Sequence, residues 1–417
     1  MHLHSLFIWL ISLASIVCML LRPRGIPEYV WVCSGAAVLV IARLLSPDTA
    51  LSAVLKGVDI YLFLFGMMVL AELARDEGVF DWIADVAMRH AGGSSARLFL
   101  LIYLTGTVVT ALLSNDATAV VLTPAVLATV RRAQVSPKPY LFICAFIANA
   151  ASFLLPISNP ANLVIYGRQL PPLGVWVRIF LVPSLIAIVA TYLLLRFLSR
   201  RDLQQHYEPR SSPVGLTGRG RLAVAGLVLS AIALIIRSAY GADLGFPTAL
   251  AGVATVAFVA VKDRSVPMKV ARDVTWSVLF LVAGLFVIVE AMSQAGLLQV
   301  AEGGIAWLLP KPHAVADLSS AFGVAIISNL MNNLPVALAS GAALQHLGNL
   351  PSPSHAVLLG VDLGPNLSVT GSLATILWLI ALRREGVEIT ATEFLKAGIM
   401  IMPVSLLLSV LVQTFLK

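Results

Sequence analysis

The sequence has few charged residues. Only 12% of its 417 residues are Asp, Glu, Lys or Arg, which is about half the usual ~25% share in soluble domains. Hydrophobic residues make up 59% of the chain, and the mean hydropathy is +0.92. Apolar runs of roughly 20 residues, the length that crosses a bilayer, recur from end to end. The shortage of charge therefore excludes a soluble domain and predicts an all-α integral membrane protein surrounded by lipid.

Patterns that bind metals, cofactors or ATP are also missing. The three cysteines, Cys18, Cys33 and Cys144, lie separately in apolar runs. Neither CxxC nor HExxH occurs, so a disulfide framework, structural zinc and a resident cofactor are not expected. The phosphate-binding pattern GxxxxGK[ST] is absent as well. No nucleophile–base pair stands out in the apolar runs, so we do not expect an enzyme. A lone cysteine in an apolar helix usually packs, which is our interpretation of Cys144.

The apolar runs predict about ten transmembrane helices and two re-entrant hairpins. Polar residues interrupt two further apolar stretches midway, at residues 98–130 and 315–345, which predicts two half-helices in each. The first apolar stretch is interpreted as a retained helix, because its arginines follow the apolar part. The predicted spans are 5–21, 27–45, 58–75, 140–167, 175–197, 221–238, 245–261, 275–294, 354–381 and 394–416.

The basic residues fall mostly on one side of this topology. When the first loop is placed inside, 21 of the 28 Lys and Arg residues lie in predicted cytoplasmic loops, as the positive-inside rule requires. The same distribution explains the net charge of +7 without a nucleic-acid partner. Both ends of the sequence are then predicted outside, and the polar linker 199–220 inside.

The two halves of the sequence resemble each other. Glu72 aligns with Glu290 and Asn115-Asp116 with Asn332-Asn333, at offsets of 218 and 217 residues. Asn149 aligns with Asp362 at an offset of 213. Five crossings per half would orient the halves oppositely, which is typical of secondary transporters. We therefore expect a first inverted repeat at 1–198, a cytoplasmic linker at 199–220 and a second inverted repeat at 221–417.

Four polar islands break the apolar sequence: both hairpin tips and one break in each of two spanning helices. Each break exposes half-helix ends whose free N–H groups attract oxygen-rich solutes. Asn, Ser and Thr add neutral donors and acceptors, although the same residues also cap helices. The predicted substrate-binding residues are Ser114, Asn115, Thr118, Ser158, Asn159, Asn162, Asn332, Asn333, Asn366, Thr370 and Ser372.

The islands contain two carboxylates, Asp116 and Asp362. An ionisable residue at membrane depth is by default a functional candidate, and we assign proton coupling to this pair. Asp116 could instead cap a half-helix. Glu72 and Glu290 lie near helix ends, where reaching the interface is an equal alternative.

The islands resemble those of ArsB-type arsenite and antimonite efflux pumps, which belong to a larger ion-transporter superfamily. The resemblance rests on SNDATAVVLTP (114–124), SNPANLVI (158–165), MNNLP (331–335) and GVDLGPNLSVTGSLATILWL (360–379). It implies a multi-pass protein of the bacterial inner membrane. Such a protein would export trivalent arsenic or antimony in exchange for protons, alone or with a soluble arsenite-stimulated ATPase.

The islands depart from those of sodium-coupled carboxylate carriers, which show Ser-Asn-Thr at both hairpin tips. Here the tips read Ser-Asn-Asp and Asn-Asn-Leu, and no arginine lies in any island. Arsenous acid is largely neutral, with three hydroxyls, and suits such a site better than a dicarboxylate does. The alternative that stays open is a sodium/proton antiporter of the same superfamily.

Overall fold

The computed structural model describes residues 3–207, 214–348 and 351–416, and these ranges form helices joined by short connections. No strand occurs within them, and Ser94 and His206 form an isolated bridge. The all-α prediction is confirmed. Of the predicted linker 199–220, residues 208–213 lie outside the described ranges. The part before them is attached to the first half, since the Tyr207 hydroxyl donates to the Met88 carbonyl at 3.1 Å.

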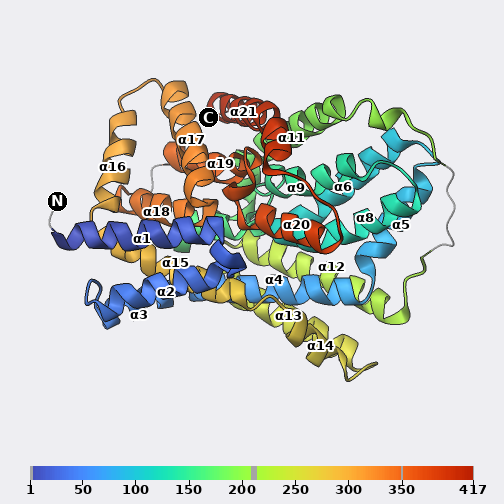
Figure 1. The fold of residues 1–417 in the computed structure, drawn as a ribbon, viewed down its shortest axis with the longest axis horizontal. Coiled ribbons are helices and arrows are strands. Elements are labelled where there is room, and N and C mark those ends of the chain that lie inside the picture. Colours follow the sequence, from blue (N-terminus) through green and yellow to red (C-terminus); the bar gives the residue numbers. More distant parts are fainter. Residues whose placement is uncertain (1–2, 208–213, 349–350, 417) are drawn as a thin grey trace.

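Two closely packed helix pairs form one layer of the molecule (Figure 1). Helix α4 (Val58–Asp76) packs on α13 (Gly245–Ala260), and α15 (Ser277–Gln294) packs on α2 (Glu28–Ile41). Small residues permit the first contact, because a Cβ at Gly66 would lie 2.3 Å from the Thr248 backbone. Close backbone approach of this kind is how helices associate in lipid. Three further helices pack against these two pairs: α1 (Leu3–Leu21), α3 (Pro47–Lys56) and α12 (Gly218–Ala239).

Both predicted hairpins are present, and they occupy opposite ends of the molecule (Figure 1). The first consists of α6 (Ser95–Leu112), α7 (Asn115–Ala117), a π-helical turn at Thr118–Leu122 and α8 (Thr123–Arg132). The second consists of α17 (His313–Met331) and α18 (Asn333–His346). Each reverses at the polar island that predicted it. Asn332 begins α18 with a positive φ of 75°, a conformation that asparagine tolerates better than most residues.

Two predicted spans are broken, as their polar islands indicated. The span predicted at 140–167 consists of α9 (Pro137–Ala150) and α10 (Pro160–Tyr166). The span predicted at 354–381 consists of α19 (Pro351–Leu363) and α20 (Leu373–Arg384). Proline favours such interruptions because it lacks an N–H and suits the first turn of a new helix, where Pro160 lies. Beside these breaks, α11 (Leu173–Leu198) packs on α21 (Ala391–Phe415).

Seven described helices are long and apolar enough to cross a membrane, or eight if the bent pair α3–α4 is one span. Two of the seven are α6 and α17, so length alone does not separate a hairpin arm from a span. The sequence did not predict four shorter helices, which lie in connections between predicted elements: α3, α5 (Val79–His90), α14 (Val266–Asp273) and α16 (Leu297–Leu308).

Candidate functional site

Four half-helices begin at the four polar islands, and each N-terminus is capped by a Ser or Asn of its island. The Ser114 hydroxyl accepts from the Ala117 amide at 3.1 Å. The Asn159, Asn332 and Ser372 side chains accept in the same way at the starts of α10, α18 and α20. Capping fixes where each half-helix starts. The islands therefore place four positive helix ends at defined points in the fold.

These helix ends meet around a central cavity with an empty volume of about 370 Å³. The first residues of all four half-helices line it, so backbone N–H groups from both halves of the chain surround one space. The polar lining residues are Asn115, Asp116, Asn159, Asn333 and Ser372. Five of the thirteen predicted site residues thus meet here, drawn from all four islands.

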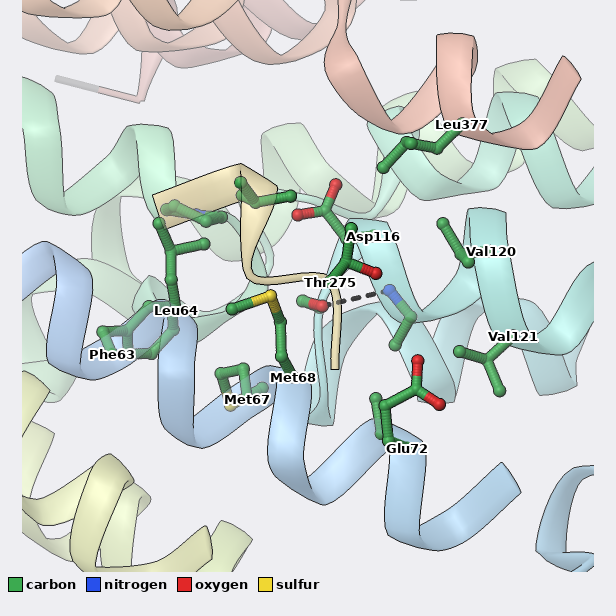
Figure 2. Close-up of a pocket in the computed structure, with 15 residues that line it drawn as sticks. Phe63, Leu64, Met67, Met68, Glu72, Asp116, Val120, Val121, Thr275 and Leu377 are labelled. Atoms are coloured by element: carbon green, nitrogen blue, oxygen red, sulfur yellow. Dashed lines mark hydrogen bonds between the residues drawn. The ribbon is translucent and has the colours of Figure 1, made fainter. Parts of the chain in front are cut away.

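A second cavity, which we call the Glu72 cavity, adjoins the first. It has an empty volume of about 540 Å³ and is lined by Ser114, Asp116, Glu72 and apolar residues of α4. Leu64, Asp116, Pro160 and Val278 line both cavities. Figure 2 shows Asp116 and Glu72 projecting into this space from the hairpin and from α4. Asp116 therefore lies where the two cavities join.

The two aspartates occupy different environments. Asp116 is partly exposed to the cavities, and Asp362 is completely buried behind Asn159. The Asn159 amide donates to Oδ1 of Asp362 at 2.7 Å, and the Ser152 side chain lies beside the same carboxyl group. Asn159 itself lines the central cavity. Asp362 therefore reaches the cavity only through Asn159.

Other predicted residues tie the helix breaks together and do not line either cavity. The Asn149 amide donates to Asn366 at 3.0 Å, and Asn366 donates to the Phe146 carbonyl at 3.1 Å. Asn162 donates to the Ser152 carbonyl at 2.9 Å, and Ser158 donates to the Ala111 carbonyl at 3.0 Å. These bonds satisfy the backbone freed by the breaks.

Thr118 also turns away from the cavities. Its hydroxyl lies 2.8 Å from that of Thr110 on the other arm of the hairpin. Both hydroxyls are fully buried, so the pair joins α6 to the π-helical turn. In this geometry Thr118 makes a hydrogen bond within the hairpin. Its substrate-binding role stays a prediction.

Asn332 and Thr370 belong to a separate cluster beside the second hairpin. The Asn332 amide donates to the Thr370 carbonyl at 3.4 Å, and the Thr370 hydroxyl donates to the Asn329 carbonyl at 2.9 Å. Ser368 donates to Oδ1 of Asn329 at 2.6 Å. The sequence analysis missed Asn329, although it lies just before an island that was recognised. This cluster joins the hairpin to the break that precedes α20.

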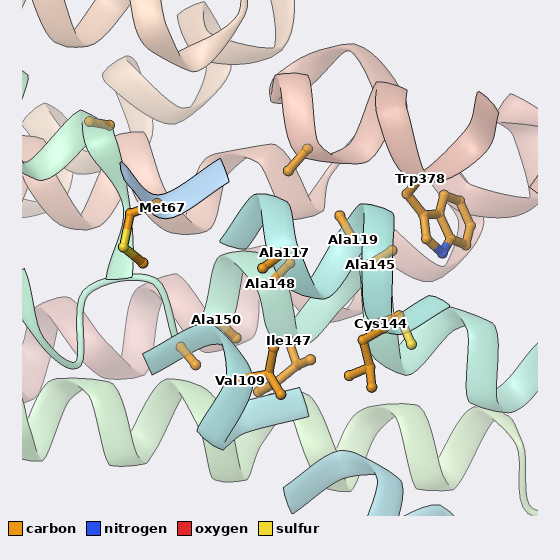
Figure 3. Packing of buried hydrophobic residues seen from close by; sticks show 14 of the residues in the cluster. Met67, Val109, Ala117, Ala119, Cys144, Ala145, Ile147, Ala148, Ala150 and Trp378 are labelled. Atoms are coloured by element: carbon orange, nitrogen blue, oxygen red, sulfur yellow. The ribbon is translucent and has the colours of Figure 1, made fainter. Parts of the chain in front are cut away.

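The linings of the central and Glu72 cavities, as far as the described residues form them, contain no Lys, Arg or His. Cys144 is absent from both linings as well. It is fully buried, its thiol lies 3.6 Å from the Tyr140 carbonyl, and Figure 3 shows it among buried apolar side chains. The two cavities therefore offer amides, hydroxyls, helix N-termini and the carboxylates of Asp116 and Glu72, without a cationic side chain or a thiol in the described lining.

Broken helices and opposed hairpins whose N-termini meet at one central cavity are typical of a membrane transporter. The chain matches the citrate transporter family, CitMHS, over residues 9–361. It is 30% identical over 357 residues to an arsenical pump membrane protein of Yersinia enterocolitica, covering 81% of this chain and 82% of that protein. An arsenical pump membrane protein of Escherichia coli is 28% identical over 411 residues, 94% and 95% of the two chains.

The fold also resembles a solved structure, the YdaH transporter of Alcanivorax borkumensis. The TM-score is 0.60 at 17% identity, with 93% of this chain and 97% of that chain covered. The chain belongs to the citrate transporter family, among the arsenical pump membrane proteins of ArsB type. It is a multi-pass protein of the bacterial inner membrane.

Proposed function

We propose that the protein exports trivalent arsenic, as arsenite or arsenous acid, and antimonite from the cytoplasm in exchange for protons. The observation that carries the proposal is the central cavity, where four helix N-termini and neutral amides surround Asp116. Arsenous acid is a small, largely neutral solute with three hydroxyls. Its oxygens suit the N–H groups and amide donors, and its hydroxyl hydrogens suit the Asp116 carboxylate.

The same lining disfavours citrate, the solute for which the matched family is named. A tricarboxylate would have to approach Asp116, a like charge, in a cavity whose described lining has no Lys, Arg or His. Like charges repel strongly where water is scarce. Helix N-termini contribute only partial positive charge, and their effect falls off within the first turn. A neutral hydroxylated solute avoids this cost.

Proton coupling is assigned to Asp116 and Asp362. Neither carboxylate has an ion-pair partner among the described residues, and an ionised carboxylate buried at membrane depth is costly without one. A proton on Oδ2 of Asp362 would remove that cost and preserve the bond from Asn159 to Oδ1. In the proposed cycle the aspartates release a proton to the cytoplasm, bind solute there, and take up a proton outside.

The two halves of the chain are proposed to act as inverted repeats, 1–198 and 221–417, joined by a cytoplasmic linker. The hairpins at opposite ends of the molecule support this arrangement (Figure 1). Each half supplies a hairpin and a broken helix to the central cavity. The cavity is then a shared site at the membrane midplane.

Arsenite uptake into everted membrane vesicles tests the proposal. An imposed gradient, acidic inside the vesicle, should drive arsenite accumulation without ATP. Antimonite should compete, and Asn115→Ala should weaken uptake. Stimulation by an added soluble arsenite-stimulated ATPase would reveal a second working mode. Sodium-driven proton movement without arsenite would instead support the sodium/proton antiporter, and gradient-driven citrate uptake would support a carboxylate carrier.

A further inference from the structure

Helices α4 and α15 line three cavities in opposite order. The third, which we call the Glu290 cavity, has an empty volume of about 1300 Å³. Along α4, Ile60 lines the Glu290 cavity, Leu64 the central cavity and Glu72 the Glu72 cavity. Along α15, Val278 lines the Glu72 cavity, Val282 the central cavity and Glu290 its own. The three cavities therefore follow one another along the same two helices.

The two outer cavities are related by the internal repeat. Met68, Ala71 and Glu72 line one, and the residues 218 positions later, Phe286, Val289 and Glu290, line the other. Leu64 and Val282 have the same offset, and both line the central cavity. Each glutamate follows its central-cavity residue by eight positions, or about 12 Å of helix. The central cavity thus has a glutamate at a similar distance on either side.

Each of the two glutamates forms an ion pair, but the two pairs differ in exposure and in the size of the cavity beside them. Glu72 contacts Arg75 at 2.6 Å, and its side chain is only 6% exposed. Glu290 contacts Lys56 at 2.9 Å, with 25% exposure. The Glu290 cavity is also larger than the Glu72 cavity, about 1300 against 540 Å³ of empty volume. The structure is therefore narrow at the Glu72 end and wide at the Glu290 end.

The Glu290 cavity has further polar groups at its walls. Ser293, Gln169 and Gln345 line it together with Lys56 and Glu290. The central cavity and the Glu290 cavity share α10, α15 and α18, with linings about one helical turn apart on each. A solute that leaves the central cavity along these helices therefore meets polar side chains before it meets open water.

We propose that Glu72 and Glu290 are two additional binding positions on one solute path, one at each mouth of the central cavity. This inference rests on the proposed function. Each carboxylate accepts hydrogen bonds from solute hydroxyls, and Arg75 or Lys56 competes for the same oxygens. The Arg75 pair narrows the Glu72 mouth in this conformation. By the charge distribution, the Glu72 mouth faces the cytoplasm and the Glu290 mouth faces outside.

Thiol accessibility at the symmetry-related positions Ala71 and Val289 tests the path. In a chain whose three native cysteines are replaced by alanine, Val289→Cys should react with a charged, membrane-impermeant methanethiosulfonate from outside. Ala71→Cys should react only from the cytoplasmic side. Leu250→Cys is a control for the lipid-facing surface, since Leu250 lies on α13 with 57% exposure, and it should resist the charged reagent. Reaction of Ala71→Cys and Val289→Cys from the same side, or of neither, would overturn the path.

Arsenite kinetics test the binding role of Glu290. Glu290→Gln should raise the KM for arsenite about fivefold, because a charged acceptor binds roughly twice as strongly as a neutral one. The matched control is Glu302→Gln, since Glu302 is 23% exposed and contacts His346 at 2.8 Å but lines none of the three cavities. Equal effects of the two substitutions would refute the binding role. Thiol labelling does not require arsenite, so the expected labelling without arsenite transport would reject only the proposed function.

Discussion

Asp116 and Asp362 look equivalent in the sequence, since each is the carboxylate of one polar island in its half of the chain. Their surroundings differ completely. Asp116 lies where two cavities join and lacks a hydrogen-bond partner for its carboxylate among the described residues. Asp362 is completely buried and accepts from Asn159 at 2.7 Å. One aspartate can touch a solute, whereas the Asn159 amide lies between the other and the central cavity.

The difference suggests a division of labour between the two halves. Asn159 joins them, because its carbonyl oxygen caps α10 and its amide reaches Asp362 from the other half. Protonation at Oδ2 of Asp362 leaves this bond in place but removes the negative charge beside the side chain that caps α10. Protonation at Asp116 alters the cavity lining directly. The predictions below test whether the two carboxylates differ in this way.

The largest effect is expected when both carboxylates are neutralised. Asp116→Asn combined with Asp362→Asn should abolish proton-driven accumulation of arsenite, because no titrating group is left in the islands. Downhill exchange should persist, since the amides retain shape and donors. Arsenite flux in vesicles with and without a pH gradient measures both. If the double variant still concentrates arsenite, neither residue carries the proton, and Glu72 and Glu290 become the next candidates.

The single substitutions should separate the two roles. Asp116→Asn should raise the KM for arsenite about tenfold, because a charged hydrogen-bond acceptor in the cavity is lost, a change worth ~1.5 kcal/mol. Asp362→Asn should leave KM within about twofold and alter the pH dependence of the maximal rate. Initial rates across a pH series distinguish them. Identical KM and pH profiles for the two variants would remove the proposed division of labour.

Folding stability should depend more on Asp362 than on Asp116, which is the reverse of the order expected for the arsenite KM. Asp362→Ala leaves the buried Asn159 amide without its acceptor, which should cost ~1–3 kcal/mol. Asp116→Ala removes a carboxylate from the first turn of a helix and should cost less than ~1 kcal/mol. Thermal unfolding of the two purified variants in detergent gives the comparison. A lower midpoint for Asp116→Ala than for Asp362→Ala would contradict the environments described above.

The same contrast extends to the asparagines. Asn115 lines the central cavity, and Asn162 donates to the Ser152 carbonyl inside a helix break. Asn115→Ala should therefore raise the arsenite KM about fivefold, for the loss of a hydrogen bond worth ~1 kcal/mol. Asn162→Ala should leave KM unchanged and lower the unfolding midpoint. Kinetics and thermal unfolding of both variants are needed, and a KM change in Asn162→Ala alone would reverse the assignment.

The sequence predicted where the chain breaks but not where each polar side chain points. Apolar runs interrupted at Asn115 and Asn333 were enough to locate both hairpin tips, because irregular backbone at membrane depth needs polar partners. The same composition serves capping, backbone satisfaction and solute binding alike. The contact of Asn159 with Asp362 joins residues 203 positions apart, and no local pattern specifies it. Asn329 was overlooked because it lies within the predicted hairpin arm, three residues before the island that begins at Asn332.

The smallest effect is expected at Cys144. Arsenic binds thiolates tightly, so a cysteine near the path is an obvious alternative ligand. Cys144 is fully buried and lines neither the central cavity nor the Glu72 cavity. Its thiol contacts the Tyr140 carbonyl. Cys144→Ala should therefore leave arsenite KM and uptake within about twofold of the unmodified protein, and should cost only ~1 kcal/mol of stability for the lost packing. Cys144→Ser keeps the side-chain volume nearly constant and serves as the matched variant. A defect that comes from lost packing volume would therefore appear in Cys144→Ala and not in Cys144→Ser. Loss of arsenite uptake in both variants, with membrane levels of the protein unchanged, would mean that the thiol takes part in transport and that the amide-lined cavity is not the whole binding site.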